Sequence, residues 1–353
     1  MSAAATAIDL LGRAVEAGEL PGWALAGGCG GAVEVLEVGG LAEAGGAARA
    51  MTPGTLFDIA SLTKVVATLP VTLALVRDGV LSLGTRVVEH LPRFDTGPGK
   101  AQVTVEQLLT HTSGLPPTPP EGTTRLPAAA IRERIVSERL VAAPGSRVTY
   151  SDVGFLVLGQ LVERAADAPL DVLLARHVTQ PLALVHTGYG PVDPARAAAT
   201  EPRLDGTICR GTVHDEVAAA LGGVAGHAGM FATVGDLAGY LAAWVAPGEG
   251  WLPHRLRIQA TRDHTTHLDG HRGLGWTARH DRYDQLGAGW PPSAVFHSGF
   301  TGTSLALDLP SRRWVVLLTN DVHFGRGRET INPLRRAVHA AFAPPAAIER
   351  RSG

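Results

Sequence analysis

The sequence predicts an α/β fold of the α+β kind, in which an antiparallel sheet with flanking terminal helices carries an inserted all-α lobe. Strand-like apolar runs occur near both ends of the chain, at residues 22–38 and 273–319, whereas helical periodicity dominates the middle. We therefore expect residues 1–80 and 250–353 to build a sheet region. Residues 81–249 are expected to build a mostly helical lobe.

The first twenty residues predict an amphipathic helix instead of a secretion signal. They lack a basic start, and Asp9, Arg13 and Glu16 interrupt their apolar pattern. The longest apolar stretch, residues 65–76, falls short of the roughly 20 residues that a membrane span needs. We therefore expect a cytoplasmic protein that does not cross a bilayer.

The remaining elements follow from the spacing of apolar residues and from turn signals. Residues 22–30 and 32–38 flank a glycine pair and predict a β-hairpin, and a helix is expected from Ser61, with a kink or a late start at Pro70. Further helices are predicted at residues 103–109, 128–140, 153–166, 170–177, 237–245 and 333–342. Further strands are predicted at residues 273–278, 294–298, 303–309 and 314–319.

Charge and cysteine content narrow the classes of partner. The 31 basic and 33 acidic residues nearly cancel, and neither kind forms a block, so a nucleic-acid groove or a membrane-surface patch has no support. Cys29 and Cys209 lack the spacing of a metal or redox motif. We expect a small-molecule partner, and the sequence says nothing of the oligomeric state.

A Ser-x-x-Lys pair is the first chemical motif. Only two lysines, Lys64 and Lys100, occur in the chain, so a retained lysine calls for a reason. Lys64 follows Ser61 at a helical spacing that places both side chains on one face near the helix start. A buried lysine can lose its proton and act as a base, which arginine cannot do.

Two further segments carry candidate chemistry. Tyr150-Ser151-Asp152 lies between a turn and a predicted helix, where a phenol can exchange a proton with a nucleophile; a half-buried tyrosine beside a helix-capping Asp152 is the structural alternative. His297-Ser298-Gly299 ends a predicted strand, where a glycine lets a substrate approach and nearby N–H groups can line an oxyanion hole. An ordinary hairpin is the alternative there.

In chain order these three elements resemble the Ser-x-x-Lys, Tyr-x-Asn and Lys/His-x-Gly motifs of the serine β-lactamase and penicillin-binding protein superfamily, in particular its class C β-lactamase-like hydrolases and esterases. Residues 108–115, Leu-Leu-Thr-His-Thr-Ser-Gly-Leu, and residues 228–233 are similar to further segments of that group. The resemblance covers about residues 5–343. It implies a β-lactamase/transpeptidase-like fold, with the active site between sheet and helical lobe and with neither cofactor nor metal.

The resemblance also implies roles for individual residues. Ser61 would be the nucleophile, Lys64 and Tyr150 the acid/base pair, and the N–H groups of Ser61 and Phe300 the oxyanion donors. Whether Lys64 or Tyr150 takes the hydroxyl proton stays open. The residues implied in substrate binding are Asp152, His297, Ser298, Gly299 and Phe300, joined by His214 and Asp215 of a segment, residues 211–216, that resembles another part of the group.

Two departures from the family pattern bear on the substrate. Asp152 stands where asparagine is usual, and His297 stands where a lysine often binds a substrate carboxylate. Losing a fixed cation and adding an acid disfavours anionic acyl substrates. We expect a serine hydrolase that forms a Ser61 acyl-enzyme from a small ester or amide, with hydrolysis and transfer to another acceptor both open.

Several alternatives remain at this point. Within the superfamily, the chain is a candidate β-lactamase or D-Ala-D-Ala carboxypeptidase acting on peptidoglycan fragments. From another class comes a non-catalytic protein that binds or senses an acyl ligand, although such a protein needs none of the three motifs chemically. His264, His267 and His271 suggest a metal hydrolase, but the chain has no His-Glu-x-x-His helix.

Overall fold

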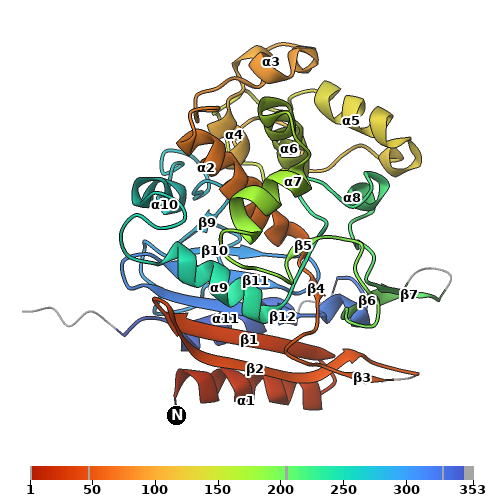
Figure 1. Cartoon of the computed structure of the whole chain (residues 1–353), viewed down its shortest axis with the longest axis vertical. Helices are drawn as coiled ribbons and strands as arrows, with labels where there is room; N and C mark the ends of the chain where they lie inside the picture. Colours follow the sequence, from red (N-terminus) through yellow and green to blue (C-terminus); the bar gives the residue numbers. More distant parts are fainter. Residues whose placement is uncertain (1, 47, 203–205, 328–329, 346–353) are drawn as a thin grey trace, which may run out of the picture.

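The main sheet is built from both ends of the chain. A computed structural model of the protein describes residues 2–46, 48–202, 206–327 and 330–345. The strands run β3-β2-β1-β12-β11-β10-β9, and every neighbouring pair is antiparallel. Their bounds are β1 (Gly22–Cys29), β2 (Ala32–Glu43), β3 (Arg49–Ala50), β9 (Thr277–Ala278), β10 (Val295–Ser298), β11 (Ser304–Asp308) and β12 (Arg313–Thr319). Because β1 pairs with β12, the N-terminal hairpin closes onto the C-terminal strands (Figure 1).

Helices cover both faces of this sheet. The terminal helices α1 (Ala3–Glu16) and α11 (Ile331–Ala341) pack together on one face, and α9 (Val234–Trp244) packs on the other (Figure 1). Along β12, Val315 and Leu317 belong to the core beneath the terminal helices, while Val316 belongs to the core on the opposite face. Successive strand residues point to opposite faces, so the unbroken apolar run of β12 matches burial on both sides.

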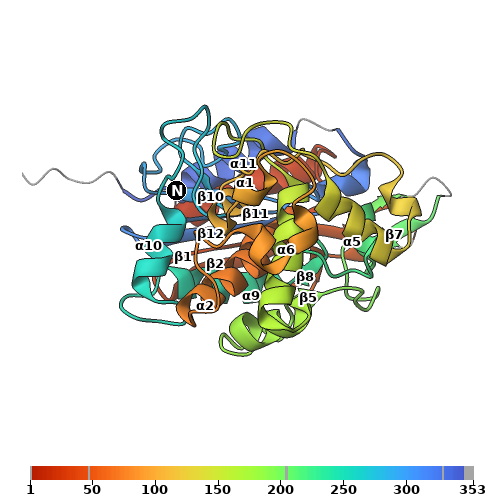
Figure 2. The same ribbon diagram turned by 90° about the horizontal axis from the view of Figure 1, so that it is seen from above.

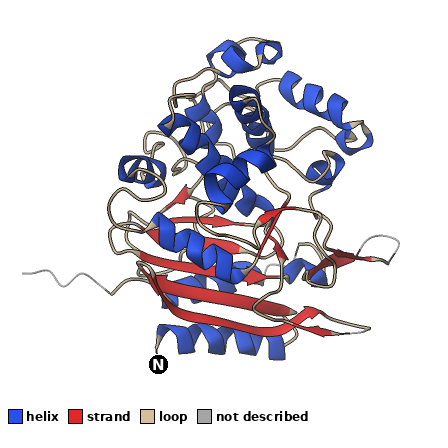
Figure 3. Ribbon diagram, in the orientation of Figure 1, coloured by secondary structure: helices blue, strands red, loops and turns tan. Residues whose placement is uncertain are grey.

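The helical lobe lies over the sheet, as Figures 2 and 3 show from above and by secondary structure. Its helices are α2 (Leu69–Arg77), α3 (Val87–His90), α4 (Val105–Leu109), α5 (Ala128–Ser137), α6 (Asp152–Ala166), α7 (Leu170–Leu174), α8 (Glu216–Ala220) and α10 (His254–Thr261). Helix α6 is central, with an almost wholly buried apolar run from Val153 to Val162. Its N-cap Ser151 accepts a hydrogen bond from Gly154 N at 2.9 Å, which explains why the helix begins there.

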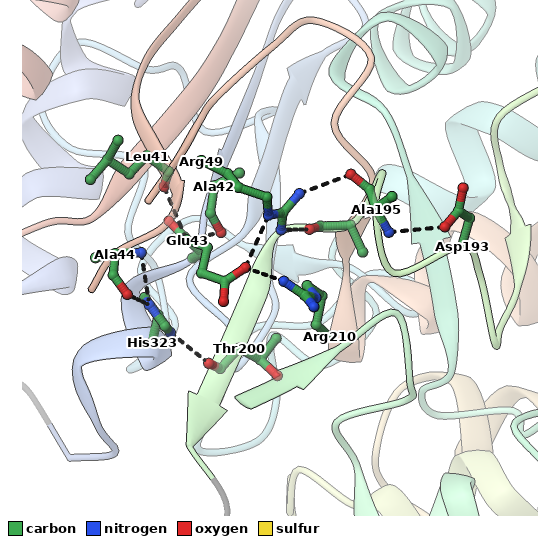
Figure 4. Close-up of polar contacts among 12 residues, drawn as sticks. Leu41, Ala42, Glu43, Ala44, Arg49, Asp193, Ala195, Thr200, Arg210 and His323 are labelled. Carbon is green, nitrogen blue, oxygen red and sulfur yellow. Dashed lines mark hydrogen bonds and ion pairs between the residues drawn. The ribbon is translucent and has the colours of Figure 1, made fainter. Parts of the chain in front are cut away.

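Short strands complete the architecture. A three-stranded sheet joins β4 (Phe57–Asp58), β8 (Met230–Ala232) and β5 (Gly188–Tyr189), and β6 (Ala199–Pro202) pairs with β7 (Ile208–Arg210). Figure 4 shows how Glu43 of β2 holds two arginines, because its carboxylate accepts from Arg49 and Arg210. His323 adds a link between Ala44 and Thr200 in the same region. These contacts fasten the end of β2 to β6 and β7.

The structure differs from the sequence-based expectations in four places. The chain at Ser61 starts with a 3-10 turn (Ala60–Leu62) and a π-helical turn (Lys64–Thr68), so the α-helix begins only at Leu69, with Pro70 in its first turn where a missing N–H is tolerated. Only Thr277–Ala278 of the strand expected at residues 273–278 forms, and α10 was not expected. The lobe boundaries also differ, since α2 lies among the helices and α9 lies on the sheet.

One helical segment in the described part of the chain, Ala60–Arg77, is long and apolar enough by composition to cross a membrane. That segment is 83% buried inside the protein. It therefore packs as a core helix of this fold.

Candidate active site

Ser61 lies in a constrained turn between β4 and the helical stretch that leads into α2. The preceding residue, Ala60, has φ of +46°, a left-handed conformation that non-glycine residues rarely adopt. Its amide donates to Asp58 Oδ1 at 2.8 Å, and Asp58 Oδ2 accepts the amide of His214 at 2.8 Å. Burial raises the pKa of Asp58 to about 6 against these two hydrogen bonds. The strained turn is thus held by a buried carboxylate directly before Ser61.

Lys64 is fully buried, and its ammonium lies among polar groups. Its Nζ donates to Ser61 Oγ at 3.0 Å and to the carbonyl oxygen of His227 at 3.2 Å, and it lies 2.7 Å from Asp152 Oδ1. Burial alone lowers the pKa of Lys64, but the carboxylate of Asp152, followed by Tyr150, outweighs burial and raises the pKa above its ordinary value. Beside Asp152, Lys64 therefore favours its charged form, so burial by itself does not make it a base.

Tyr150 is the meeting point of the three motifs. Its ring centroid lies 5.0 Å from Lys64 Nζ, 4.6 Å from the ring of His111 and 6.2 Å from the ring of His297. His111 Nδ1 accepts the amide of Ser151 at 3.0 Å, so it braces the turn that presents Tyr150. Burial, reinforced by Arg272 and Lys64, lowers the pKa of His111 far below its usual value, so this brace is neutral.

His297 is buried and neutral. Burial, then the positive charges of Lys64 and Arg272, lower its pKa well below the usual value. Its Nδ1 lies 2.9 Å from the carbonyl of Ser298, which can only accept, so Nδ1 carries the hydrogen. Nε2 has no partner among the described residues and stays an acceptor. The position at which relatives often carry a lysine therefore carries no charge here.

Arg272 is a site residue that the sequence analysis missed. Its guanidinium carbon lies 5.8 Å from the ring centroid of Tyr150 and 5.2 Å from that of Tyr283. Its Nη2 is 3.1 Å from Asp281 Oδ1, and the side chains of Arg272 and Asp281 are each only 1% exposed. Burial lowers the pKa of Arg272 while Asp281 opposes that effect. No local pattern marks this arginine, because the tyrosine that it approaches belongs to a distant segment.

The loop after β10 is bonded to the segment that precedes Ser61. Thr301 Oγ1 donates to Asp58 O at 2.7 Å, and Thr303 Oγ1 donates to Ile59 O at 3.2 Å. Gly299 fits between them, since a Cβ there would lie 2.4 Å from Ile59 O. In the described part of the chain, neither the Ser61 amide nor the Phe300 amide donates to a protein acceptor. The two implied oxyanion donors therefore belong to segments that are held together and have free N–H groups.

Phe300 forms an exposed wall beside this loop. The residue is 56% exposed. Its ring stacks on His214 with centroids 5.6 Å apart, and the Arg326 guanidinium lies 5.7 Å from the ring. His214 Nε2 is 3.2 Å from Glu201 Oε1. His214 thus acts in the structure as a support for Phe300.

Asp215 is half-buried, with its side chain 31% exposed, and its expected contact with substrate stays a prediction. Its carboxylate caps α8 by accepting Ala218 N at 2.8 Å, and it accepts His227 Nε2 at 3.0 Å. Burial alone raises the pKa of Asp215, but His227 outweighs it and lowers the pKa. The carbonyl of His227 in turn contacts Lys64, so His227 links Asp215 to the site.

The histidine pattern at residues 264–271 does not converge. His264 Nδ1 lies 2.9 Å from Glu106 Oε1, whereas His271 Nδ1 lies 2.6 Å from Asp263 Oδ2. Among the residues that the structure describes, no group of three or more His, Cys, Asp or Glu side chains is arranged to hold a metal ion.

Comparisons with known proteins agree with this architecture. The sequence profile of the Beta-lactamase family matches residues 7–340. An Escherichia coli (strain K12) protein named "Putative D-alanyl-D-alanine carboxypeptidase" is 31% identical over 305 residues, covering 77% of this chain and 70% of that protein. An N-acetylmuramyl-L-alanine amidase of Bacillus subtilis (strain 168) is 32% identical over 309 residues, covering 77% and 69%. The solved structure of EstCE1, a hydrolase with promiscuous acyltransferase activity, superposes with a TM-score of 0.78 at 22% identity, covering 96% of this chain and 98% of that one.

Proposed function

This chain belongs to the Beta-lactamase family and is a serine hydrolase of the β-lactamase and penicillin-binding protein superfamily, and we propose that it transfers the acyl group of a small, uncharged ester or amide through an ester on Ser61. Charge compensation is the observation that carries the proposal. Lys64 is paired with Asp152, Arg272 is paired with Asp281, and His297 is neutral. At these three positions a substrate carboxylate would therefore meet paired or neutral groups. The guanidinium of Arg282 lies over the ring of Tyr283, 5.0 Å from its centroid.

In the proposed reaction Tyr150 exchanges the proton and Lys64 acts as a fixed cation. Lys64 already donates to Ser61 Oγ and keeps its proton, so Tyr150, entering the step as the phenolate, is the group left to accept the hydroxyl hydrogen and becomes the neutral phenol. The seryl oxygen attacks the carbonyl carbon, and the N–H groups of Ser61 and Phe300 stabilise the resulting oxyanion. Collapse breaks the bond to the leaving group, which takes the proton back from Tyr150. Water or another acceptor then attacks the acyl carbon while Tyr150 takes its proton. The bond to Ser61 breaks, and Tyr150 returns that proton to the seryl oxygen.

The surroundings of the site support an apolar substrate. Phe300 is 56% exposed, and Tyr283 is 43% exposed with its ring centroid 5.9 Å from that of Tyr150. Exposed aromatic rings beside a reactive centre favour contact with an apolar acyl or alcohol group. The relatives differ in the reactions that their names state, so the choice of substrate rests on these side chains.

Substitution of Ser61 with alanine tests the proposed nucleophile. The variant should lose hydrolysis of a p-nitrophenyl acyl ester while it keeps the circular dichroism spectrum and unfolding midpoint of the wild type. Intact mass spectrometry of the wild type, exposed to a panel of esters, amides and β-lactams, should show an acyl adduct that decays; an adduct that never decays would indicate a sensor instead. Undiminished ester turnover in Ser61→Ala would remove the mechanism.

A D-Ala-D-Ala carboxypeptidase is the second candidate. The Escherichia coli relative named for this activity is 31% identical over 77% of this chain, which favours a peptide substrate. This candidate predicts faster cleavage of a D-Ala-D-Ala peptide than of a short ester. Comparing kcat/KM for the two substrates on one preparation separates the two functions.

A further inference from the structure

A buried guanidinium lies behind the loop that follows β10. Arg335, on α11, is 4% exposed, and its Nη2 donates to the carbonyl oxygen of Gly299 at 3.1 Å. Its Nη1 donates to Gln285 Oε1 at 3.3 Å and to Asn332 Oδ1 at 3.2 Å. Burial lowers the pKa of Arg335 to about 10, with Asp321 opposing, so the guanidinium is charged at neutral pH.

The carbonyl that Arg335 binds belongs to the same peptide unit as the amide of Phe300. In a planar trans peptide the C=O and the N–H point in opposite directions. Holding the Gly299 oxygen toward α11 therefore turns the Phe300 N–H away from α11. That N–H has no protein acceptor in the described part of the chain, so it is free to bind a ligand oxygen.

The orientation of this peptide depends on its contacts, because glycines lie at it and close after it. Gly299 lacks a Cβ, and Gly302, whose amide donates to Gly299 O at 3.1 Å, has φ of +112°. Glycines allow a peptide plane to rotate at small cost. Thr301 and Thr303 fasten the opposite side of the loop to the residues before Ser61. Arg335 supplies the charged anchor on the side of α11.

We propose that Arg335 is a positioning residue of the oxyanion hole, which orients and polarises the Gly299–Phe300 peptide so that the Phe300 N–H donates to the tetrahedral intermediate. A cation on the carbonyl oxygen draws electron density from the amide and strengthens the N–H as a donor. A donor that is oriented beforehand needs no reorganisation when charge develops on the substrate. This inference rests on the proposed acyl transfer at Ser61, and Arg335 acts through Gly299 without touching the substrate.

Three variants test this role. Arg335→Met removes the charge and the bond to Gly299, Arg335→Lys keeps the charge but loses the planar fork, and Asn332→Ala removes only a partner of Nη1 and serves as the control. Active sites are titrated with a fluorophosphonate, so that misfolded protein does not enter the rates. Acylation and deacylation rate constants for p-nitrophenyl butyrate and the affinity for an alkylboronic acid are then measured per titrated site.

Arg335→Met should lower both rate constants and the boronate affinity by a similar factor of about 10 to 100, because deleting an oxyanion donor costs about 100- to 1000-fold and here the donor is only misaligned. Arg335→Lys should recover part of the loss, and Asn332→Ala should stay within about twofold of the wild type. Per-site values for Arg335→Met within about twofold of the wild type would overturn the proposal.

If Arg335→Met yields no titratable sites, Arg335→Lys carries the test, with an expected loss of about fivefold in the same three quantities. Unchanged per-site values in a folded Arg335→Lys would then overturn the proposal. If the proposed function itself is wrong, the wild type forms no Ser61 adduct. That result is distinct from a failure of the Arg335 proposal, in which the wild type still forms the adduct.

Discussion

Replacing Asp152 with asparagine removes the charge that keeps Lys64 protonated and nearly preserves the shape of the side chain. At the observed 2.7 Å, Coulomb's law with an effective dielectric constant of 20 gives about 6 kcal/mol. Asp152 is 24% exposed, so water screens roughly half of this energy and leaves about 3 kcal/mol. At about 1.4 kcal/mol per unit, the pKa of Lys64 should fall by about 2 units.

The change also alters stability, with a sign that follows from the direction of the shift. The pKa of Lys64 is raised in the folded protein, so its stabilising contribution is complete below the unfolded value and is lost only as the pH rises through the folded value. At pH 7 the wild type therefore has the full contribution. Asp152→Asn leaves a buried ammonium without its counter-charge, and the free energy of unfolding should fall by about 2–3 kcal/mol.

The assay is the pH profile of kcat/KM for a p-nitrophenyl ester from pH 6 to pH 10.5, together with urea unfolding at pH 7. In the wild type, loss of the Lys64 proton should not lower kcat/KM within this range, because the pKa of Lys64 is raised above its ordinary value. In Asp152→Asn the fall should begin about 2 units lower than in the wild type. Asp263→Asn, which alters a carboxylate paired outside the site, is the control. A free energy of unfolding at pH 7 that is the same for Asp152→Asn as for the wild type would refute this account of Lys64.

Three further substitutions test other parts of the structure. Lys64→Arg should retain at most about a tenth of wild-type turnover, which corresponds to a barrier increase of about 1.4 kcal/mol or more. The reason is that a guanidinium does not fit the fully buried position between Ser61 and Asp152. Greater turnover would show that Lys64 acts only as a nearby charge. His297→Lys should raise kcat/KM for nitrocefin and a D-Ala-D-Ala peptide relative to p-nitrophenyl butyrate, because it adds a cation where the wild type is neutral. A wild type that already prefers these anionic substrates would contradict the ester assignment. Lys100→Met should lower the free energy of unfolding by about 2 kcal/mol and leave the activity per titrated site unchanged. The reason is that the Lys100 ammonium donates to Thr96 Oγ1 and to two backbone carbonyls at the end of α5. A free energy of unfolding equal to that of the wild type would show that these contacts add no stability.

Local spacing in the sequence was enough to identify the central part of the site. Ser61 and Lys64 are three residues apart, so a helical turn of any kind brings them together, and the structure has their side chains 3.0 Å apart. The unbroken apolar run of β12 likewise predicts a strand buried on both faces. The start of α6 was also predicted to within one residue, although its N-cap is Ser151 and Asp152, offered as the cap, is the first helical residue. These features depend on residues that are neighbours along the chain.

Only the tertiary structure decided the charge state of the site and the supports around it. Whether buried Lys64 loses or keeps its proton depends on Asp152, which α6 brings to 2.7 Å. Arg272 and Arg335 approach Tyr150 and Gly299 from a loop and from the last helix, and no short motif in the sequence marks either arginine. Burial and opposing charge shift proton affinities only when distant segments pack together, so the sum of these effects cannot be obtained from residue spacing alone.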